Sequence, residues 1–263
     1  NKSWARLGRC SFCEELIMNR IKDYSELKFN IVKWLKDYYW MYGFKAFVVG
    51  VSGGIDSAVT STLCAETGLP VYALGMPLLQ KRKQEDLSDN YLKWLTDNYD
   101  NVRTRKVDLT GIFEIFRVVM DDLGTDKHAL ANSRSRLRMT TLYQVAGSIG
   151  GVVVGTGNKV EDYGVGFYTK YGDGGVDIAP IADLYKTEVR ELGRFLGVDQ
   201  SIIEAHPTDG LWDDGRTDED QLGVSYEVLE EAMENGTGPG VEVLRKFNRR
   251  NKHKMEPIPT FKL

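Results

Sequence analysis

Glycine and hydroxyl residues are concentrated in one short turn, S-G-G-I-D-S at residues 52–57. The preceding run, A-F-V-V-G-V at 46–51, is continuously apolar, which is typical of a parallel strand covered on both faces. A turn between such a strand and a helix leaves backbone N–H groups free, and these favour an anion such as phosphate. Gly53 and Gly54 would let the backbone approach the phosphate oxygens closely.

The side chains of this turn are also suited to a nucleotide. The hydroxyls of Ser52 and Ser57 would add hydrogen-bond donors, and Asp56 could hold a magnesium ion against the phosphates. Two other phosphate loops are excluded, because the turn lacks the lysine of a Walker loop and the G-x-G-x-x-G spacing of a dinucleotide fingerprint. A plain tight turn is the alternative for S-G-G alone. The longer pattern S-G-G-x-D-S after a buried strand favours phosphate binding.

The cysteines and histidines give little support for metal or redox chemistry. Cys10 and Cys13 form a single C-x-x-C pair, Cys64 stands alone, and no second pair follows to complete a zinc site. The three histidines are far apart and lack H-x-x-x-H spacing. We therefore expect ordinary thiols in a reducing cytoplasm.

The elements that must position the turn alternate between strand and helix. Strand-like segments are predicted at 46–52, 70–78, 102–109 and 150–157, of which the first and last have the apolar character of buried strands, and helical spacing predicts helices at 24–44, 84–99, 220–234 and 240–250. Gly43 is the expected stop of the first helix. This alternation predicts an α/β fold with a Rossmann-like, doubly wound parallel sheet. Two stretches rich in glycine, aspartate and aromatic residues, 163–180 and 206–220, fit neither pattern, and we expect mobile loops over the site.

Composition limits the partners of the chain. Its 263 residues, 42% of them hydrophobic, suffice for one large α/β domain. A net charge of −4 argues against a general nucleic-acid binder. No apolar run approaches the roughly 20 residues that span a membrane. We expect small-molecule partners, with no nucleic acid and no membrane.

The S-G-G-x-D-S turn resembles the pyrophosphate loop of the N-type ATP pyrophosphatases, which activate a substrate oxygen as its adenylate. Further stretches resemble the NAD synthetases of that superfamily, whose fold is the adenine nucleotide alpha-hydrolase type. They are A-L-A-N-S-R-S-R-L-R-M-T-T-L-Y at 129–143, G-T-G-N-K-V-E-D at 155–162, and the long segments at 166–192, 207–223 and 253–259. Ser135 replaces the usual alanine. The resemblance implies an N-terminal extension at 1–24 and a synthetase domain at 25–263.

The resemblance implies a reaction in which ATP, deamido-NAD and ammonia give NAD, AMP and pyrophosphate. ATP is then a co-substrate and Mg²⁺ the cofactor. The synthetase motifs start within the first fifty residues, which leaves no room in this sequence for a fused glutamine amidase domain. We therefore expect free ammonia, or a separate protein, as the nitrogen donor. Because ammonia is mostly ammonium at neutral pH, a carboxylate has to take a proton.

Carried over position by position, the resemblance implies the residues of the site. It places Mg²⁺ on Asp56 and Glu161. It assigns ATP to Gly50, Val51, Ser52, Gly53, Gly54, Ile55, Asp56, Ser57, Thr156, Lys186 and Thr208. It assigns deamido-NAD to Arg136, Lys170, Asp177, His253 and Lys254. Asp56 would act in catalysis, and Asp173, Asp177 and Asp209 are the candidates for deprotonating ammonium.

Several of these residues have plainer alternatives. Lys186 could simply solvate a helix face, Asp177 could cap a loop, and His253 could be a surface residue. Arg134 and Arg138 share one helix face while Arg136 points about 200° away, so the three arginines cannot reach one ligand. Arg136 is chosen from the resemblance, with Arg138 in reserve.

Two other functions remain open from the sequence. One is a different pyrophosphate-loop synthetase, such as a GMP synthetase-like enzyme, and the other is a non-enzymatic ATP-binding module. The resemblance also implies a homodimer. The aromatic helix F-N-I-V-K-W-L-K-D-Y-Y-W-M-Y at 29–42 could face a partner, although its aromatic residues also fit ordinary core packing.

Overall fold

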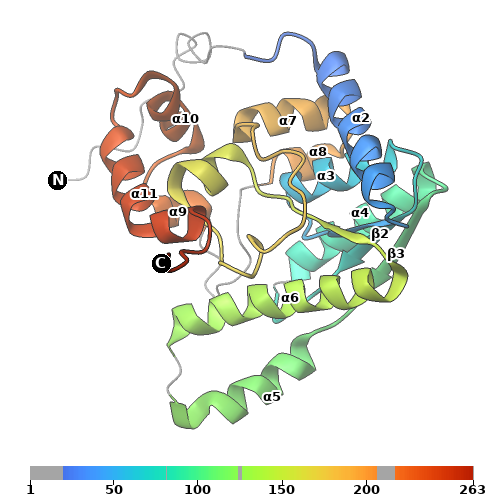
Figure 1. Ribbon diagram of the computed structural model, residues 1–263, viewed down its shortest axis with the longest axis horizontal. Helices are drawn as coiled ribbons and strands as arrows, with labels where there is room; N and C mark the ends of the chain where they lie inside the picture. Colours follow the sequence, from blue (N-terminus) through green and yellow to red (C-terminus); the bar gives the residue numbers. More distant parts are fainter. Residues whose placement is uncertain (1–19, 81, 124–125, 206–216, 263) are drawn as a thin grey trace.

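The computed structural model describes residues 20–80, 82–123, 126–205 and 217–262. Within these residues, four parallel strands form a single sheet (Figure 1). The strand order is β3-β2-β1-β4. The strands are β1 (Phe47–Gly50), β2 (Val71–Gly75), β3 (Val102–Lys106) and β4 (Val152–Val154). All four lie within the predicted strand segments. Cys10 and Cys13 lie outside the described residues.

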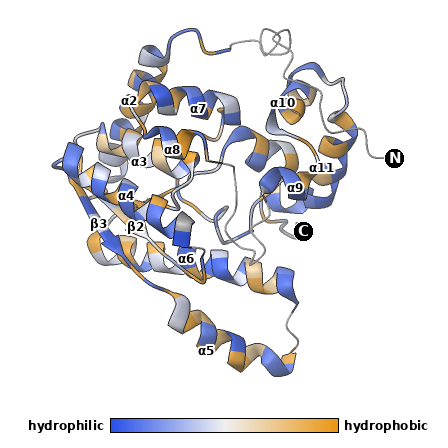
Figure 2. Cartoon of the chain, turned by 180° about the vertical axis from the view of Figure 1, so that it is seen from behind, coloured by the Kyte–Doolittle hydropathy of each residue, from blue (hydrophilic) through white to orange (hydrophobic). Residues whose placement is uncertain are grey.

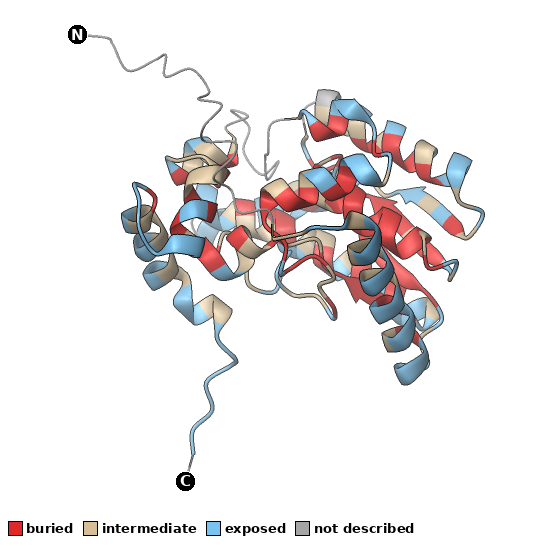
Figure 3. Ribbon diagram, turned by 90° about the horizontal axis from the view of Figure 1, so that it is seen from above, coloured by how far each residue is buried: buried red, intermediate tan, exposed pale blue. Residues whose placement is uncertain are grey.

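Helices cover both faces of the sheet, as the predicted α/β fold requires. On one face Phe47 and Val49 pack with α2 (Tyr24–Tyr42), α3 (Ile55–Ala65), α4 (Arg82–Asn98), α7 (Lys186–Phe195) and α8 (Gln200–Ile203). On the other face Val48 packs with α5 (Thr110–Met120) and α6 (Lys127–Ile149). Strands β1, β2 and β4 are mostly buried between these layers, whereas the edge strand β3 and the outer helix faces are largely exposed (Figure 3). Apolar residues on both sides of β1 explain why its sequence does not alternate.

The parallel register brings the functional segments to one edge of the sheet. Val49 lies opposite Ala73 of β2 and Val154 of β4, so β1 is central and is flanked by both strands. Because all strands run in the same direction, the turn at 51–54 and the segment at 155–159 leave the sheet at its carboxyl edge. Ligands of open α/β sheets bind at this edge.

Helix boundaries follow the capping residues. Asp23 accepts hydrogen bonds from the first turn of α2, and Gly43 ends that helix with a positive φ of 69°, which confirms the predicted stop. The prediction of one helix at 220–234 was wrong in one respect, because the structure has two helices there. Gly223, with a φ of 81°, divides the segment into α9 (Asp218–Leu222) and α10 (Tyr226–Asn235).

The last helices form a smaller unit beside the sheet. α9, α10 and α11 (Val241–Met255) pack around a π-helical turn, η2 (Val160–Val165), through a third apolar cluster. In Figure 1 these three helices lie together, away from β2 and β3. The segment 163–180 is held by many internal hydrogen bonds, such as Gly172 N–H to Thr169 O at 2.9 Å. Its expected mobility stays a prediction. Within the described residues no helix is both apolar and long enough to cross a membrane.

The start of the described chain is fastened to the body of the protein. Arg20 donates to the carboxylate of Glu188 at 2.7 Å and to the carbonyl of Asp183 at 2.8 Å. Its guanidinium lies 4.6 Å from the centre of the Tyr185 ring. These contacts reach the N-terminal end of α7, whose first residue is Lys186.

Candidate active site

The turn after β1 is closed by its own serines. The Ser57 hydroxyl donates to the carbonyl of Gly54 at 2.9 Å and accepts from the N–H of Ser52 at 3.2 Å. The Ser52 hydroxyl accepts from the N–H of Gly54 at 3.2 Å. These hydrogen bonds fix the conformation of the turn at the N-terminus of α3. The predicted strand–turn–helix arrangement is therefore present.

The N-terminus of α3 is available to an anion. Gly54 is its N-cap, and no side chain among the described residues caps this end. Gly53 has a φ of 84° and lies against the backbone of α4, where a Cβ would come 2.9 Å from the N of Ser88. Only glycine fits there. The turn thus offers uncapped N–H groups at a positive helix end, a geometry suited to phosphate.

Two carboxylates from distant parts of the chain meet on one ammonium beside this turn. Lys186 Nζ lies 2.5 Å from Asp56 Oδ2 and 2.9 Å from Glu161 Oε1. The lysine side chain is 3% exposed, and the two carboxylates are 16% and 17% exposed. Asp56 comes from α3, Glu161 from η2 and Lys186 from the first position of α7. The fold thus brings together the two residues predicted to hold metal and one predicted to bind ATP.

The charges of this cluster are mutually satisfied. Burial alone would lower the pKa of Lys186, but the carboxylates of Asp56 and Glu161 together raise it well above its ordinary value. The lysine is therefore a cation at any physiological pH. The plainer alternative for Lys186, a solvated helix face, is excluded by its burial.

The cluster also fits a magnesium ion. Mg²⁺ is commonly bound through one or two protein carboxylates together with phosphate oxygens and water. Asp56 and Glu161 supply two carboxylates, and the ammonium between them shows that a cation is accommodated there. Mg²⁺ would supply charge that neutralises the triphosphate.

Asn158 positions both carboxylates and was missed by the sequence reasoning. Its side chain is fully buried; the amide donates to Asp56 Oδ1 at 3.2 Å, and its oxygen accepts from the N–H groups of Val160 and Glu161. One side chain thus contacts one predicted metal ligand and caps the turn that carries the other. Its position inside G-T-G-N-K-V-E-D, the segment that also carries Glu161, could have indicated a role at the site.

Asp162 is a second residue that the sequence reasoning missed. Its carboxyl group packs against Gly157, where an added Cβ would meet Asp162 Oδ2 at 2.2 Å. Burial, followed by the charges of Glu161, Asp173 and Asp56, raises the pKa of Asp162 to about 8. Its position directly after Glu161 was the only signal, and acidic neighbours of that kind are too common to be informative.

Four of the residues predicted to bind deamido-NAD form a second cluster. Arg136 Nε donates to the carbonyl of Lys170 at 3.2 Å, and Lys170 Nζ donates to the carbonyl of His253 at 3.2 Å. Lys254 Nζ donates to the carbonyls of Gly166 and Tyr168 at 2.6 and 2.7 Å. The C-terminal end of α11 is thereby joined to the segment 166–170 and to α6.

The three arginines of α6 divide as their spacing predicts. Arg136 is exposed, whereas Arg134 is 7% exposed and lies 5.2 Å from the Phe113 ring centre. Arg138 Nε donates to the carbonyl of Met76 at 3.1 Å. Arg136 is therefore the one that faces outward with Lys170.

Two of the aspartates predicted to deprotonate ammonium have structural partners. Asp173 Oδ1 accepts from the hydroxyl of Ser135 at 2.5 Å and from the N–H of Thr169 at 3.1 Å. Asp177 accepts from the hydroxyl of Tyr143 at 2.8 Å and from the N–H of Val153 at 2.8 Å. Ser135, the departure from the usual alanine, thus fastens the loop that carries Asp173.

The remaining predicted residues divide between two cases. Gly50 ends β1, Val51 and Ile55 are buried beside the turn, and Thr156 is half-buried two residues after β4. They lie at the same edge of the sheet as Asp56. Thr208 and Asp209 lie outside the described residues.

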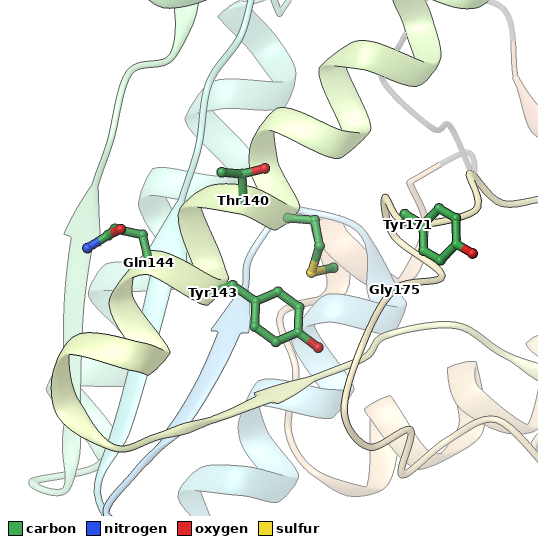
Figure 4. Close-up of a pocket in the computed structure, with 6 residues that line it drawn as sticks. Thr140, Tyr143, Gln144, Tyr171 and Gly175 are labelled. Carbon is green, nitrogen blue, oxygen red and sulfur yellow. The ribbon is translucent and has the colours of Figure 1, made fainter.

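A cavity of about 500 Å³ opens on the outer face of α6. It is lined by Met139, Thr140, Tyr143, Gln144, Tyr171 and Gly175. Figure 4 shows Thr140, Tyr143 and Gln144 on the helix and Tyr171 on the facing loop. Tyr143 and Tyr171 offer two aromatic rings, 39% and 59% exposed, to an aromatic ligand.

Comparisons with known proteins agree with this geometry. A family model described as NAD synthase matches residues 28–257. The NH(3)-dependent NAD(+) synthetase of Methanococcoides burtonii is 42% identical over 193 residues, which cover 73% of this chain and 72% of that protein.

Two solved structures share the fold. The NMN synthetase of Francisella tularensis superposes with a TM-score of 0.86 at 32% identity, over 92% of this chain and all of that one. The NAD+ synthetase of Burkholderia pseudomallei superposes with a TM-score of 0.72 at 26% identity, over 93% and 94%. The predicted fold class is therefore confirmed.

Proposed function

Because this chain belongs to the NAD synthase family, we propose that it is an ATP-dependent, ammonia-using synthetase that turns deamido-NAD into NAD, AMP and pyrophosphate. The observation that carries the proposal is the meeting of Asp56 and Glu161 beside the S-G-G-I-D-S turn. This arrangement provides a phosphate site and a divalent-cation site side by side, as adenylation by ATP requires.

The chemistry runs in two steps. A carboxylate oxygen of the pyridine ring substituent attacks the α-phosphorus of ATP, a new P–O bond forms and the bond to pyrophosphate breaks. Ammonia then attacks the carbonyl carbon of the acyl adenylate, and AMP leaves with the electrons of the C–O bond. The first step turns a poor leaving group into a good one.

The residues of the turn would position the ATP phosphates for the first step. Backbone N–H groups at the start of α3 would bind phosphate oxygens, and Lys186 could move its ammonium from the carboxylates to a phosphate. Asp56 and Glu161 would hold Mg²⁺, which neutralises charge on the triphosphate when bound. Positioning and charge neutralisation are the main contributions that a protein makes to such transfers.

The acid substrate would lie along the outer face of α6. Arg136 and Lys170 supply positive charge near the cavity at Tyr143 and Tyr171, which suits a phosphate-bearing aromatic ligand. Asp173, Asp177 and Asp209 remain the candidates for taking the proton of ammonium.

A second candidate substrate is the acid mononucleotide. The superposition with the structure named NMN synthetase has the higher TM-score of the two, 0.86 against 0.72. An enzyme of that name makes the same amide on a mononucleotide. Only the recognition of the adenylyl half would differ between the two functions.

One experiment separates these possibilities. The protein is incubated with Mg-ATP and ammonium, and with deamido-NAD, nicotinic acid mononucleotide or xanthosine monophosphate in separate reactions, and the products are separated by chromatography. We expect NAD, AMP and pyrophosphate in equal amounts from deamido-NAD, and little product when glutamine replaces ammonium. Preferential formation of the mononucleotide amide would assign the second function. Formation of GMP from xanthosine monophosphate, or no pyrophosphate with any acid, would contradict both.

A substitution tests the assignment of the acid-binding arginine. Arg136→Ala should raise KM for the acid substrate about tenfold or more, because a charge-assisted contact is lost, while KM for ATP changes little. Arg138→Ala serves as the matched control on the other face of α6. Equal losses for ATP and for the acid would contradict the assignment.

We also propose that the protein is a homodimer. Helix α5 carries a row of exposed apolar side chains, and its apolar residues appear orange in Figure 2. They are Ile112, Ile115, Val118 and Val119 of α5, joined by Leu123 of the 3-10 turn η1 (Asp121–Leu123) that follows, and each is more than half exposed. Apolar patches of this kind support a contact with a second protein surface, and a second copy is the partner that the family resemblance implies.

The domain limits and the location are likewise proposals. We place the synthetase domain at 25–263, which encloses the matched segment 28–257, and the N-terminal extension at 1–24. A cytoplasmic location stays a prediction from the use of cysteine. The described cysteine, Cys64, is a free and fully buried thiol, and burial raises its pKa.

A further inference from the structure

One residue of the C-terminal helices reaches the predicted metal site. Tyr226 begins α10, a helix that lies apart from the sheet strands β2 and β3 (Figure 1). Its hydroxyl donates to Glu161 Oε1 at 2.7 Å, which is the same oxygen that receives Lys186 Nζ at 2.9 Å. It also lies 3.3 Å from Asp218 Oδ2 of α9. Two donors on one oxygen restrict the orientation of the Glu161 carboxylate.

The Tyr226 side chain is buried and makes contacts through both its ring and its hydroxyl. Its side chain is fully buried, and Lys186 Nζ lies 4.9 Å from its ring centre. A buried phenol hydroxyl is costly unless it finds a partner, so its bond to a carboxylate is a strong one. The ring supports the ammonium while the hydroxyl holds the carboxylate. Both contacts act on the groups that surround the proposed magnesium position.

A second residue of α10 secures this arrangement from one turn away. Glu230, 2% exposed, accepts from the N–H of Thr187 at 3.0 Å and from its hydroxyl at 2.6 Å. Thr187 follows Lys186 in the first turn of α7. Residues four apart share one face of a helix, so a single face of α10 contacts Glu161 and Lys186 through Tyr226 and the neighbouring Thr187 through Glu230.

We propose that Tyr226 is a positioning residue that orients Glu161 to hold the magnesium ion. This inference rests on the proposed function in that Glu161 is taken as a metal ligand. Without the hydroxyl, Lys186 would be the remaining strong donor on Glu161 Oε1, and the carboxylate could turn toward the ammonium. Partners of metal ligands commonly contribute about 10- to 100-fold to metal affinity or activity.

The test removes the hydroxyl and measures metal binding directly. Tyr226→Phe and the unaltered protein are titrated with Mn²⁺, a spectroscopic substitute for Mg²⁺ at oxygen ligands, in the presence of a non-hydrolysable ATP analogue. Free Mn²⁺ is followed by electron paramagnetic resonance. We expect Mn²⁺ to bind about tenfold more weakly to the variant. The Mg²⁺ concentration for half-maximal turnover should rise in proportion, with kcat at saturating Mg²⁺ largely retained.

A matched control accounts for the structural cost of losing a buried hydroxyl. Tyr91 is 1% exposed, and its hydroxyl donates to the carbonyl of Ala58 at 2.8 Å, without touching Glu161. Tyr91→Phe should lower the melting temperature without changing Mn²⁺ affinity. If Tyr226→Phe binds Mn²⁺ as tightly as the unaltered protein does, the proposal is overturned. A loss of Mn²⁺ affinity equal to that of Tyr91→Phe would overturn it as well.

A double substitution tests whether the hydroxyl acts through Glu161. Glu161→Gln should weaken Mn²⁺ binding by itself, and adding Tyr226→Phe should then cause little further loss. Independent losses that multiply would contradict the proposed route. Undiminished Mn²⁺ binding by Glu161→Gln would also overturn it, even if Tyr226→Phe did not fold.

These outcomes can be separated from those of the proposed function. Mn²⁺ binding is measured with an ATP analogue and needs no acid substrate or ammonia. A protein that makes no amide from either nucleotide would refute the proposed function, while the Mn²⁺ titrations would still decide the role of Tyr226.

Discussion

Lys186 is a buried cation that pairs with two carboxylates from different parts of the chain. Its ammonium lies between Asp56 and Glu161, two carboxylates that belong to different elements and would otherwise repel each other. The ammonium therefore offsets the repulsion between the two carboxylates. In the proposed function, Mg²⁺ and ATP would change the partners of all three charges.

Removing this ammonium should destabilise the protein in a pH-dependent way. Lys186→Met should lower the free energy of unfolding at pH 8 by about 3 kcal/mol, because two facing carboxylates lose their partner. The unpaired carboxylates would take up protons more readily when folded, so the deficit should shrink as the pH falls toward 5. Chemical denaturation of both proteins at several pH values measures this. A deficit that does not change with pH would contradict the assignment.

The backbone at Gly53 gives a second prediction at this scale. Gly53→Ala should lower the free energy of unfolding by about 1–3 kcal/mol and weaken the binding of ATP. The reason is that the φ of 84° at Gly53 and the nearby α4 backbone both exclude a Cβ. Gly54→Ala is the matched control, because its φ is −90° and its nearest contact would be the Ser52 hydroxyl at 3.4 Å. Thermal melting and ATP-analogue binding test both. Equal tolerance at the two positions would show that the turn can change its shape.

At the scale of elements, α10 connects the C-terminal helices to α7 through Glu230. Burial raises the pKa of this carboxyl from 4.5 to about 7, although its bonds to Thr187 oppose the shift. A folded-state pKa above the unfolded value favours the folded protein while the group is protonated. That contribution is complete below about pH 4.5 and is lost as the pH rises through about 7.

Glu230→Gln should therefore remove this pH dependence. The variant should lose less stability than the unaltered protein between pH 5 and pH 8, by a difference on the order of 3 kcal/mol. Glutamine keeps an oxygen for the Thr187 N–H, and its amide can donate to the threonine hydroxyl. Glu231→Gln, on the same helix, serves as control. Parallel pH profiles for Glu230→Gln and the unaltered protein would refute the link.

Local patterns were sufficient to predict most elements. Strand-like segments located the four strands, although the sequence of β3, V-R-T-R-K, is mostly polar, and Gly43 identified the end of α2. The break at Gly223 did not follow from the sequence, because glycine inside an apolar helical pattern is tolerated as often as it ends a helix. Tyr226 and Asn158 were missed since their partners lie 65 and 102 residues away.

On the scale of the whole molecule, exposed apolar side chains gather in a row along α5. Val118 is 76% exposed, and α5 lies at the edge of the body (Figure 1). The sequence also predicted α2 as a surface that could face a partner, and there Phe29, Trp40 and Met41 are each more than 60% exposed, while Tyr39 is 6% exposed and belongs to the core. Helical spacing alone cannot tell which apolar face a second layer will cover.

The proposed homodimer should depend on this row. Val118→Glu should convert the protein largely to monomer, because a charge would be buried in an apolar contact. Light scattering after gel filtration measures the mass, and Val118→Ala is the control that keeps the surface neutral. If the unaltered protein is already monomeric at micromolar concentration, the proposal fails. A dimer that persists in Val118→Glu would move the interface elsewhere.

The contacts of Arg20 with Glu188 and Tyr185 limit how far the N-terminus of the protein can be shortened. A polypeptide started at the first residue of the matched segment would lack the guanidinium that grips Glu188 and covers Tyr185, both at the base of the helix that presents the site's ammonium. Such a fragment would keep every motif and still hold α7 less firmly. A truncated version intended for crystals or kinetics should therefore include Arg20.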